Sequence, residues 1–485
     1  MQATVAIVLR CRDELVPKAR YVFDSLLLAA GIPAVYVSRP PSSGVWLAYG
    51  AVGNEPSGSD RCVVVPHCPE AWEFLCSDSR VAAGRCSGAV TVLPHSIARE
   101  ESNHGISFDL VANAFFVLTS WHERHAATTA GTRQLFSSSI YSSGEIPSDV
   151  VDGYLKCLVR EITKLCDRRN LSIWSPREWP SGASHAVVLS HDVDFIPSGL
   201  PGSLAQGART VMRHLVRQHR ATDALKAATG LVRALVRGRD PYGCIPDIVS
   251  REKAIGVRSS FQVAVARRHP NDVNYSIEDD RIRDYLRVIC DEGFDLCLHG
   301  SYRSTENPQW YIEEAELLER RLARPSGSRQ HFLSFDYSAL FEAQERAGIR
   351  YDMSMGFPDR IGPRAGFSFP YFPYCVERDR PFGVVEISLF LMDVTLQSYM
   401  RLGATEAWAH IEGVLDNLRL KRGAISIVWH PIVFGGARDP GYDRLYWQII
   451  EYVQGAGGLA TDGRTINDFW RNQARQYDSF EACAT

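Results

Sequence analysis

Aspartate and histidine side chains recur where strand-like runs of this sequence end. Five separate segments place them there: His191, Asp192 and Asp194 after AVVLS, His299 after FDLCL, His331 in SRQHF, Asp393 after EISLFLM, and His430 after AISIVW. In α/β barrels the carboxyl ends of parallel strands meet at one mouth, where reactive side chains gather. Packing alone does not require such a repeated placement, so the pattern predicts a shared site.

The two carboxylates of HDVD are the most informative local feature. Asp192 and Asp194 are separated by one residue, so both can point to the same side of an extended chain. One could bind a divalent cation while the other stays free as a general base, and near a cation both remain ionised at neutral pH. A loop or helix-cap role for these residues is the alternative.

Several histidines extend this chemistry. His299 and His331 are candidate metal ligands, because an aspartate with two histidines is a recurring open zinc site that leaves room for water. His430, followed by Pro431, could protonate a leaving amine, with Asp393 orienting its ring. The alternatives are a strand-end histidine bonded to backbone for His430 and a helix cap for Asp393.

The elements that must position these residues alternate along the chain. From AVVLS onward, apolar runs alternate with stretches of helical spacing, which argues for a parallel sheet or barrel wrapped by helices. Residues 1–180 alternate in the same way, with the strand-like runs TVAIVLR, PAVYVS, GVWLAYG and CVVVP. The polar residues 175–185 separate the two halves. We expect helices at 21–30, 109–122, 150–165, 279–290, 310–322 and 405–418.

An insertion at about residues 197–250 interrupts the alternation with a basic helical stretch. From Arg209 to Asp240 the chain carries eight Lys or Arg and two Asp. A solvated amphipathic insertion is one interpretation. The other is a lid or platform for an anionic substrate or a membrane surface, so residues 209–239 are the candidate contact with an anionic surface.

Composition excludes several classes of protein. The 485 residues carry 53 basic and 56 acidic side chains, for a formal charge of −3, so no attraction to nucleic acid is expected. No run reaches the roughly 18 apolar residues of a transmembrane segment. The N-terminus lacks a basic region before its apolar run, which favours a cytoplasmic protein with reduced cysteines. A homo-oligomer is compatible with these features.

Taken in order, six motifs resemble those of a known family. HDVD, LHGSY, SRQHF, RAGF, EISLFLMD and WHP are similar to the polysaccharide deacetylases (carbohydrate esterase family 4, the nodulation-type deacetylase domain), over residues 185–475. FDLVANAFFVLTSWHERH and IYSSGEIPSDVVDGYL resemble the extra N-terminal domain of one branch. The resemblance implies an α/β fold: an irregular (β/α) barrel over residues 181–480, preceded by a smaller N-terminal α/β domain, 1–180, of unknown role. It also implies a divalent metal, with Zn²⁺ the expected ion, and removal of an N- or O-acetyl group from a sugar.

The resemblance assigns catalytic roles by position. Asp192 matches the catalytic base, and Arg329 matches the arginine that helps to hold that base. Asp393 falls in the fourth motif, and His430 matches the acid that protonates the leaving sugar amine. The implied reaction is therefore metal-assisted hydrolysis of an amide or ester.

The metal ligands match less closely. Asp194 matches the metal-binding aspartate, one residue later than in the commonest motif, and His299 matches the first metal-binding histidine. The family has a second histidine four residues further on, where this chain has Arg303. We expect His331 to supply the missing imidazole from another strand. Arg303 could instead fill the cation position.

Three residues are candidates for substrate binding. Ser301 and Tyr302 lie beside His299 in the sequence and could contact substrate, with a loop-packing role as the alternative. Arg364, in a run rich in glycine, proline and aromatic residues, could hold a carboxylate or phosphate, with a rigid surface loop as the alternative.

The leading prediction is a metal-dependent carbohydrate deacetylase acting on a glycan, a glycan precursor or a small glycoside. Arg303 motivates a second function, a catalytically inactive glycan-binding or scaffold protein that keeps the barrel. A third keeps the metal and hydrolyses a non-sugar amide or cyclic imide.

Overall fold

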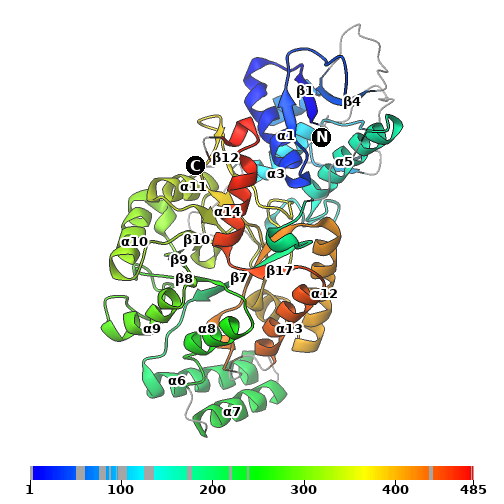
Figure 1. The fold of residues 1–485 in the computed structure, drawn as a ribbon. Helices are drawn as coiled ribbons and strands as arrows, with labels where there is room; N and C mark the ends of the chain where they lie inside the picture. The colour runs from blue at the N-terminus through cyan, green and yellow to red at the C-terminus, as the bar shows by residue number, and fades with distance from the viewer. Residues whose placement is uncertain are drawn as a thin grey trace.

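A computed structural model describes most of the chain. The described residues are 4–50, 61–75, 84–86, 89–93, 96, 106–124, 136–171, 177–217, 221–236, 240–435, 438, 441–481 and 483. Figure 1 shows three tiers: an N-terminal unit in blue, a barrel in the middle, and a pair of helices, α6 and α7, at the opposite end.

The N-terminal unit contains a parallel sheet in the order β2-β1-β3-β4, as its four apolar runs predict. The strands are β1 (Val5–Leu9), β2 (Ala34–Tyr36), β3 (Trp46–Tyr49) and β4 (Cys62–Val65), with a small hairpin of β5 (Gly84–Cys86) and β6 (Ala89–Thr91). Its helices are α1 (Val16–Ala30), α2 (Pro69–Leu75), α3 (Leu110–Leu118), α4 (Trp121–Arg124) and α5 (Val150–Arg168). The helix expected at 109–122 is split, because Ser120 adopts a left-handed backbone with φ 47° between α3 and α4.

The second half forms a parallel barrel, which confirms the predicted fold class. The strand path is β14-β11-β10-β9-β8-β7-β16-β15, and every pair along it is parallel. The path begins and ends in one extended stretch of chain, because only Ile387 and Ser388 separate β14 from β15. The sheet therefore closes on itself. Its strands are β7 (Ala186–Val193), β8 (Ser260–Val263), β9 (Asp295–Gly300), β10 (Gly327–Gln330), β11 (Tyr351–Asp352), β14 (Val385–Glu386), β15 (Leu389–Met392) and β16 (Ala424–Val428), with β17 (Leu459–Thr461) added on β7.

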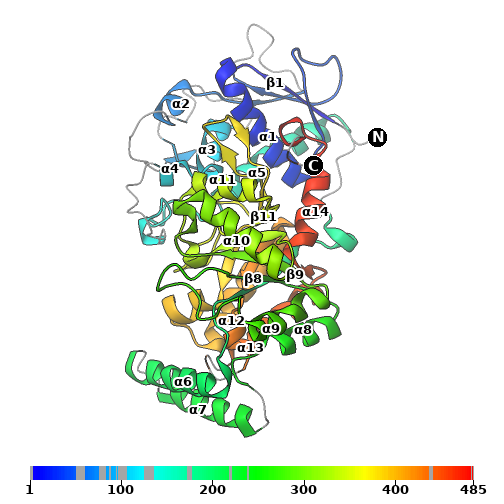
Figure 2. The same cartoon turned by 90° about the vertical axis from the view of Figure 1, so that its left-hand side faces the viewer.

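Helices cover the outside of the barrel (Figures 1 and 2). They are α8 (Ile245–Ala254), α9 (Asp280–Asp291), α10 (Pro308–Arg321), α11 (Tyr337–Ala347), α12 (Ala404–Lys421), α13 (Tyr442–Gly455) and α14 (Gly463–Ala474). The three helices expected here from sequence at 279–290, 310–322 and 405–418 correspond to α9, α10 and α12. A short antiparallel pair, β12 (Tyr374–Cys375) and β13 (Arg380–Pro381), lies toward the N-terminal unit.

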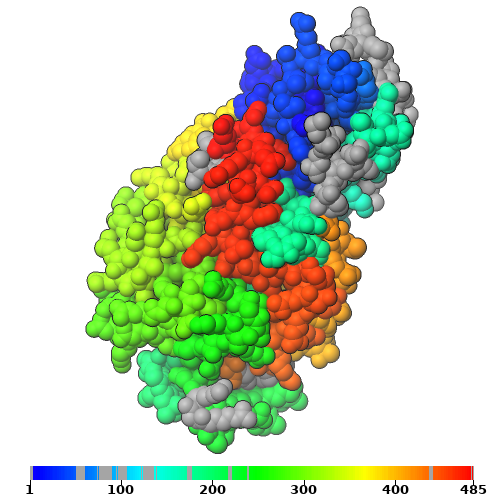
Figure 3. Space-filling model, in the orientation of Figure 1, coloured from blue at the N-terminus to red at the C-terminus, as the bar shows by residue number. Residues whose placement is uncertain are grey.

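The N-terminal unit and the barrel share one hydrophobic core. Tyr21 of α1 donates a hydrogen bond to the carbonyl oxygen of Phe372 at 2.8 Å. The C-terminal segment covers the junction, as Figure 3 shows in red, and Tyr477 donates to the carbonyl oxygen of Ile32 at 2.9 Å. Because the core is continuous, the division near residue 180 stays a prediction; residues 175 and 176 of the expected junction lie outside the described residues.

The basic insertion follows β7 and forms two helices, α6 (Gly199–Met212) and α7 (Ala221–Val236). A π-helical turn, η4 (Arg213–Arg217), continues α6. Figure 2 shows the pair projecting beyond the barrel. Residues 218–220 and 237–239 of the predicted basic stretch lie outside the described residues. Among the described helices, none combines the length and apolar character needed to cross a membrane.

Candidate active site

Strand β7 sends alternate side chains to opposite faces of the barrel wall. Ser190 and Asp192 both contact Arg329 on the inside. His191 points the other way and is buried, with Nδ1 at 2.6 Å from the carbonyl oxygen of Trp429 and Nε2 at 3.0 Å from Glu252 Oε1. His191 therefore links β7 to the outer helix that carries Glu252 and is not part of the site.

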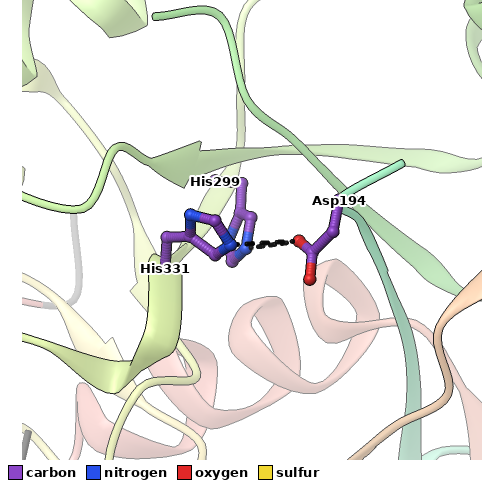
Figure 4. A group of neighbouring side chains, drawn as sticks. All are labelled: Asp194, His299 and His331. Atoms are coloured by element: carbon purple, nitrogen blue, oxygen red, sulfur yellow. Dashed lines mark ion pairs between the residues drawn. The ribbon is translucent and has the colours of Figure 1, made fainter. Parts of the chain in front are cut away.

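Asp194, His299 and His331 converge at the mouth of the barrel (Figure 4). The Nε2 atom of His299 lies 3.2 Å from Asp194 Oδ1, and the Nε2 atom of His331 lies 3.5 Å from the same oxygen. One possible ligand atom from each residue lies within 4.8 Å of the other two. Three segments far apart in the sequence thus form a candidate site for a divalent metal ion.

The chemistry of this group fits a bound cation. Asp194 Oδ1 and His299 Nε2 are buried, and apart from the ion pairs within this group neither has a hydrogen-bond partner among the described residues. Buried polar atoms are rarely left in this state, so the pair indicates a missing ligand. His299 Nδ1 lies 2.9 Å from the carbonyl oxygen of Arg329, a contact that fixes the ring and leaves Nε2 facing the site. One carboxylate and two imidazoles suit zinc or a similar ion.

Asp192 is held as a buried carboxylate beside this group. Arg329 Nη1 lies 2.5 Å from Asp192 Oδ1, and the guanidinium also donates to Ser190 Oγ and to the carbonyl oxygen of Met353, both at 2.9 Å. Burial alone would raise the pKa of Asp192, but the charges of Arg329 and His299 outweigh it and lower the pKa below its ordinary value. Asp192 is therefore ionised and can accept a proton.

His430 and Asp393 form a second charged pair at the mouth. His430 Nδ1 lies 2.6 Å from Asp393 Oδ1, and the His430 backbone N–H donates to Asp393 Oδ2 at 3.0 Å. His430 Nε2 faces Asp194 Oδ2 at 3.4 Å. Burial alone would lower the pKa of His430, but the carboxylates of Asp393 and Asp194 raise it well above its ordinary value. The ring can therefore hold a proton at Nε2, toward the site.

Arg303 does not lie in the cation position. Its side chain is half exposed and pairs with Glu306, with Nη2 at 2.6 Å from Oε2. The second imidazole comes from His331 instead. The register of β9 and β10 pairs His299 with Arg329, so His331 emerges just past the end of β10, beside His299.

The structure places Ser301 and Tyr302 differently from each other. Ser301 is buried, and both its backbone N–H and its hydroxyl donate to Glu314. This arrangement matches the loop-packing role that was the alternative for Ser301. Tyr302 is half-buried, and its ring lies edge-on to Phe332 with 5.5 Å between centroids. Tyr302 thus lies beside the site, while Ser301 supports the loop from beneath.

Arg364 is not brought into the site. It is buried, and its Nε and Nη2 atoms donate to the two carboxylate oxygens of Glu123 at 2.7 and 2.8 Å. This bidentate pair joins the barrel to the N-terminal unit. The expectation that Arg364 binds a substrate anion is therefore corrected, because the Nε and Nη2 donors of its guanidinium already bind the carboxylate of Glu123. Sequence reasoning could not identify that partner, which lies 241 positions away.

Phe332 is a site residue that sequence reasoning missed. It is 40% exposed, and its ring centroid lies 4.5 Å from that of His331. Its backbone is left-handed, with φ 58°, a conformation that costs energy for a bulky residue and is found near functional sites. Its position directly after a candidate metal ligand was the only available signal.

No family model matches the sequence, and no curated protein matches it. Among solved structures, the chain is similar to a polysaccharide deacetylase, by provisional assignment, from Mycobacterium smegmatis, with 18% identity and a TM-score of 0.41, over 62% of this chain and 95% of that one. It is also similar to PuuE allantoinase, with 16% identity and a TM-score of 0.39, over 61% of this chain and 94% of that one. The barrel assignment rests on the strand order described above.

Proposed function

We propose that this protein is a metal-dependent hydrolase that removes an acetyl group from an N- or O-acetylated sugar. The observation that carries the proposal is the meeting, at one barrel mouth, of a cation-binding group, an ionised carboxylate and a charged imidazole. Together they can support metal-assisted amide hydrolysis, and they come from the ends of four strands: Asp192 and Asp194 from β7, His299 from β9, His331 from β10 and His430 from β16.

Asp194, His299 and His331 would hold the ion, and Zn²⁺ is the ion we expect from their donor atoms. A bound divalent ion would polarise the acetyl carbonyl and stabilise the negative charge that develops on its oxygen. The protein supplies the remaining chemistry through its own side chains.

Asp192 and His430 are suited to the two proton transfers. Asp192, ionised beside Arg329, takes a proton from the attacking water as the carbon–oxygen bond forms. His430, charged beside Asp393, gives its Nε2 proton to the leaving nitrogen or oxygen as the bond to the acetyl carbon breaks. One proton is taken up and one released, so the products are acetate and the free amine or alcohol.

The preference for a sugar rests on the aromatic edge of the site. The exposed ring of Phe332 lies next to His331, and the half-buried ring of Tyr302 lies next to Phe332. Such rings offer a flat apolar surface on which the apolar face of a sugar can stack. We expect this edge to hold the ring whose acetyl group enters the mouth.

The test measures acetate release from N-acetylated glucosamine oligosaccharides, together with the zinc content of each protein. Asp192→Asn should keep its zinc and lose activity by about 10²–10⁴-fold, the usual worth of a positioned general base. Arg303→Gln is the control, because Arg303 is half exposed and paired with Glu306, so this variant should leave both values unchanged. Full activity in Asp192→Asn, or no zinc in the wild type after zinc loading, would overturn the proposal.

A further inference from the structure

The insertion exposes large apolar side chains to an unusual degree. We call α6, η4 and α7 together the hairpin. Twelve large hydrophobic residues are exposed in the described part of the chain, and eight of them lie on the hairpin. These eight are Leu200, Leu204, Met212, Leu215, Val216, Leu225, Val232 and Val236.

The pattern within the hairpin is the reverse of that of an ordinary surface helix. On α7, Leu225, Val232 and Val236 are 67%, 59% and 82% exposed, and their spacing of seven and four residues places them on one face. The buried positions of α7 are Ala224 and Ala227. The buried residues of α7 are thus small, while Leu225, Val232 and Val236 face outward.

Gly207 of α6 shows how closely the two helices approach. A Cβ atom at this position would lie 2.6 Å from the side chain of Leu231, so only glycine fits without a shift. At this point α6 and α7 are close together, and Gly207 leaves the space that the side chain of Leu231 fills.

Positive charge flanks the apolar face. Lys226 and Arg233 are exposed and lie directly beside Leu225 and Val232 in α7, and Arg209 is exposed on α6. Within α7, Asp223 is the one acidic residue. A basic, apolar surface on a protein whose total charge is −3 is a local feature and not a property of the whole chain.

The hairpin stands next to the mouth of the barrel. A cavity of about 640 Å³ lies between α6 and the strand ends, and Phe195 and Ile432 line its barrel side. These two residues follow Asp194 and His430 closely in the sequence. The barrel side of the hairpin therefore lies close to the strand ends that carry the candidate active site.

We propose that the hairpin docks on a membrane surface that contains anionic lipids. Exposed apolar side chains flanked by Lys and Arg have the composition of helices that lie in the interface of a bilayer. The charge complements an anionic headgroup layer, which is why we choose a membrane over a second copy of this protein. The proposal goes beyond the hydrolase function, and its test needs no turnover.

The experiment is sedimentation of the full-length protein with vesicles of phosphatidylcholine, with or without phosphatidylglycerol. We expect binding to the mixed vesicles, weakened by added salt. Lys226→Gln with Arg233→Gln should weaken binding roughly 30-fold, at about fivefold for each basic residue near the surface. Leu225→Ser with Val232→Ser should weaken it by roughly 100-fold, because two apolar side chains no longer enter the interface.

Matched controls separate the hairpin from general exposure. Leu420 on α12 is 79% exposed, and Leu420→Ser should bind as the wild type does. Arg320 on α10 is 63% exposed and is paired with Glu316, much as Lys226 is 64% exposed and paired with Asp223, so Arg320→Gln should also bind normally. Circular dichroism verifies that each variant is folded.

Three results would overturn the proposal. The first is no binding of the wild type to mixed vesicles at low salt. The second is equal binding by the hairpin variants and the controls. The third, from light scattering, is a dimer that dissociates in Leu225→Ser with Val232→Ser, which would assign the apolar face to a second copy of the chain.

Discussion

Replacing Arg329 by methionine should destabilise the protein strongly. The Arg329 guanidinium is fully buried and donates to Asp192, to Ser190 Oγ and to the carbonyl oxygen of Met353. Methionine fills a similar volume but donates no hydrogen bond. The variant therefore leaves Asp192 as a buried carboxylate without its main counter-charge.

The expected cost follows from that loss. Removing one partner of a buried ion pair lowers the free energy of unfolding by about 3–5 kcal/mol. Adding Asp192→Asn removes the stranded charge, so the double variant should recover about 2 kcal/mol relative to the sum of the two single effects. Loss of the guanidinium also removes the charge that keeps the pKa of Asp192 low.

Urea unfolding of the wild type, both single variants and the double variant measures this coupling. The proteins are treated with EDTA, so that bound metal does not contribute to the measured stability. Arg320→Met, at a residue that is 63% exposed, is the control and should change stability by less than about 0.5 kcal/mol. A cost below about 1 kcal/mol for Arg329→Met, or strictly additive effects, would refute the assigned pair.

Two further variants test buried carboxylates. Burial raises the pKa of Glu314 from 4.5 to about 7. Because the folded state holds this proton to higher pH than the unfolded state does, stability should fall by about 3 kcal/mol between about pH 4.5 and about pH 7. Urea titrations should show that Glu314→Gln lacks this part of the fall, and an unchanged pH dependence would contradict the prediction. Arg364→Met should lower the free energy of unfolding by about 3 kcal/mol, because it removes the buried ion pair with Glu123, and should leave the KM for acetylated sugar unchanged. A raised KM with normal stability would restore a substrate role for Arg364.

Much of the barrel could be predicted from sequence because most of its strands are apolar runs. Strand β10 is the exception. Its residues Gly327–Gln330 include no apolar side chain, yet all four are buried. Arg329 is paired with Asp192 inside the barrel, and Ser328 is bonded to Tyr311. Such partners come from distant segments, so hydrophobic periodicity cannot reveal the strand.

The candidate site was predictable where residue type and strand end coincided, as at Asp194 and His299. His331 was also expected, as the replacement for the imidazole missing at position 303, and the pairing of β9 with β10 places it beside His299. The sequence did not show which face of the hairpin points outward. Helical spacing predicts an amphipathic helix, but it does not say which face meets the protein when the buried residues are small.

The central claim is that Asp194, His299 and His331 bind one divalent cation. The most direct measurement is an anomalous difference map at the zinc absorption edge, from crystals of the protein grown with zinc. We predict one peak, bounded by Asp194 Oδ1 and the Nε2 atoms of His299 and His331. A map with no peak there, or with a peak only at other residues, would contradict the claim.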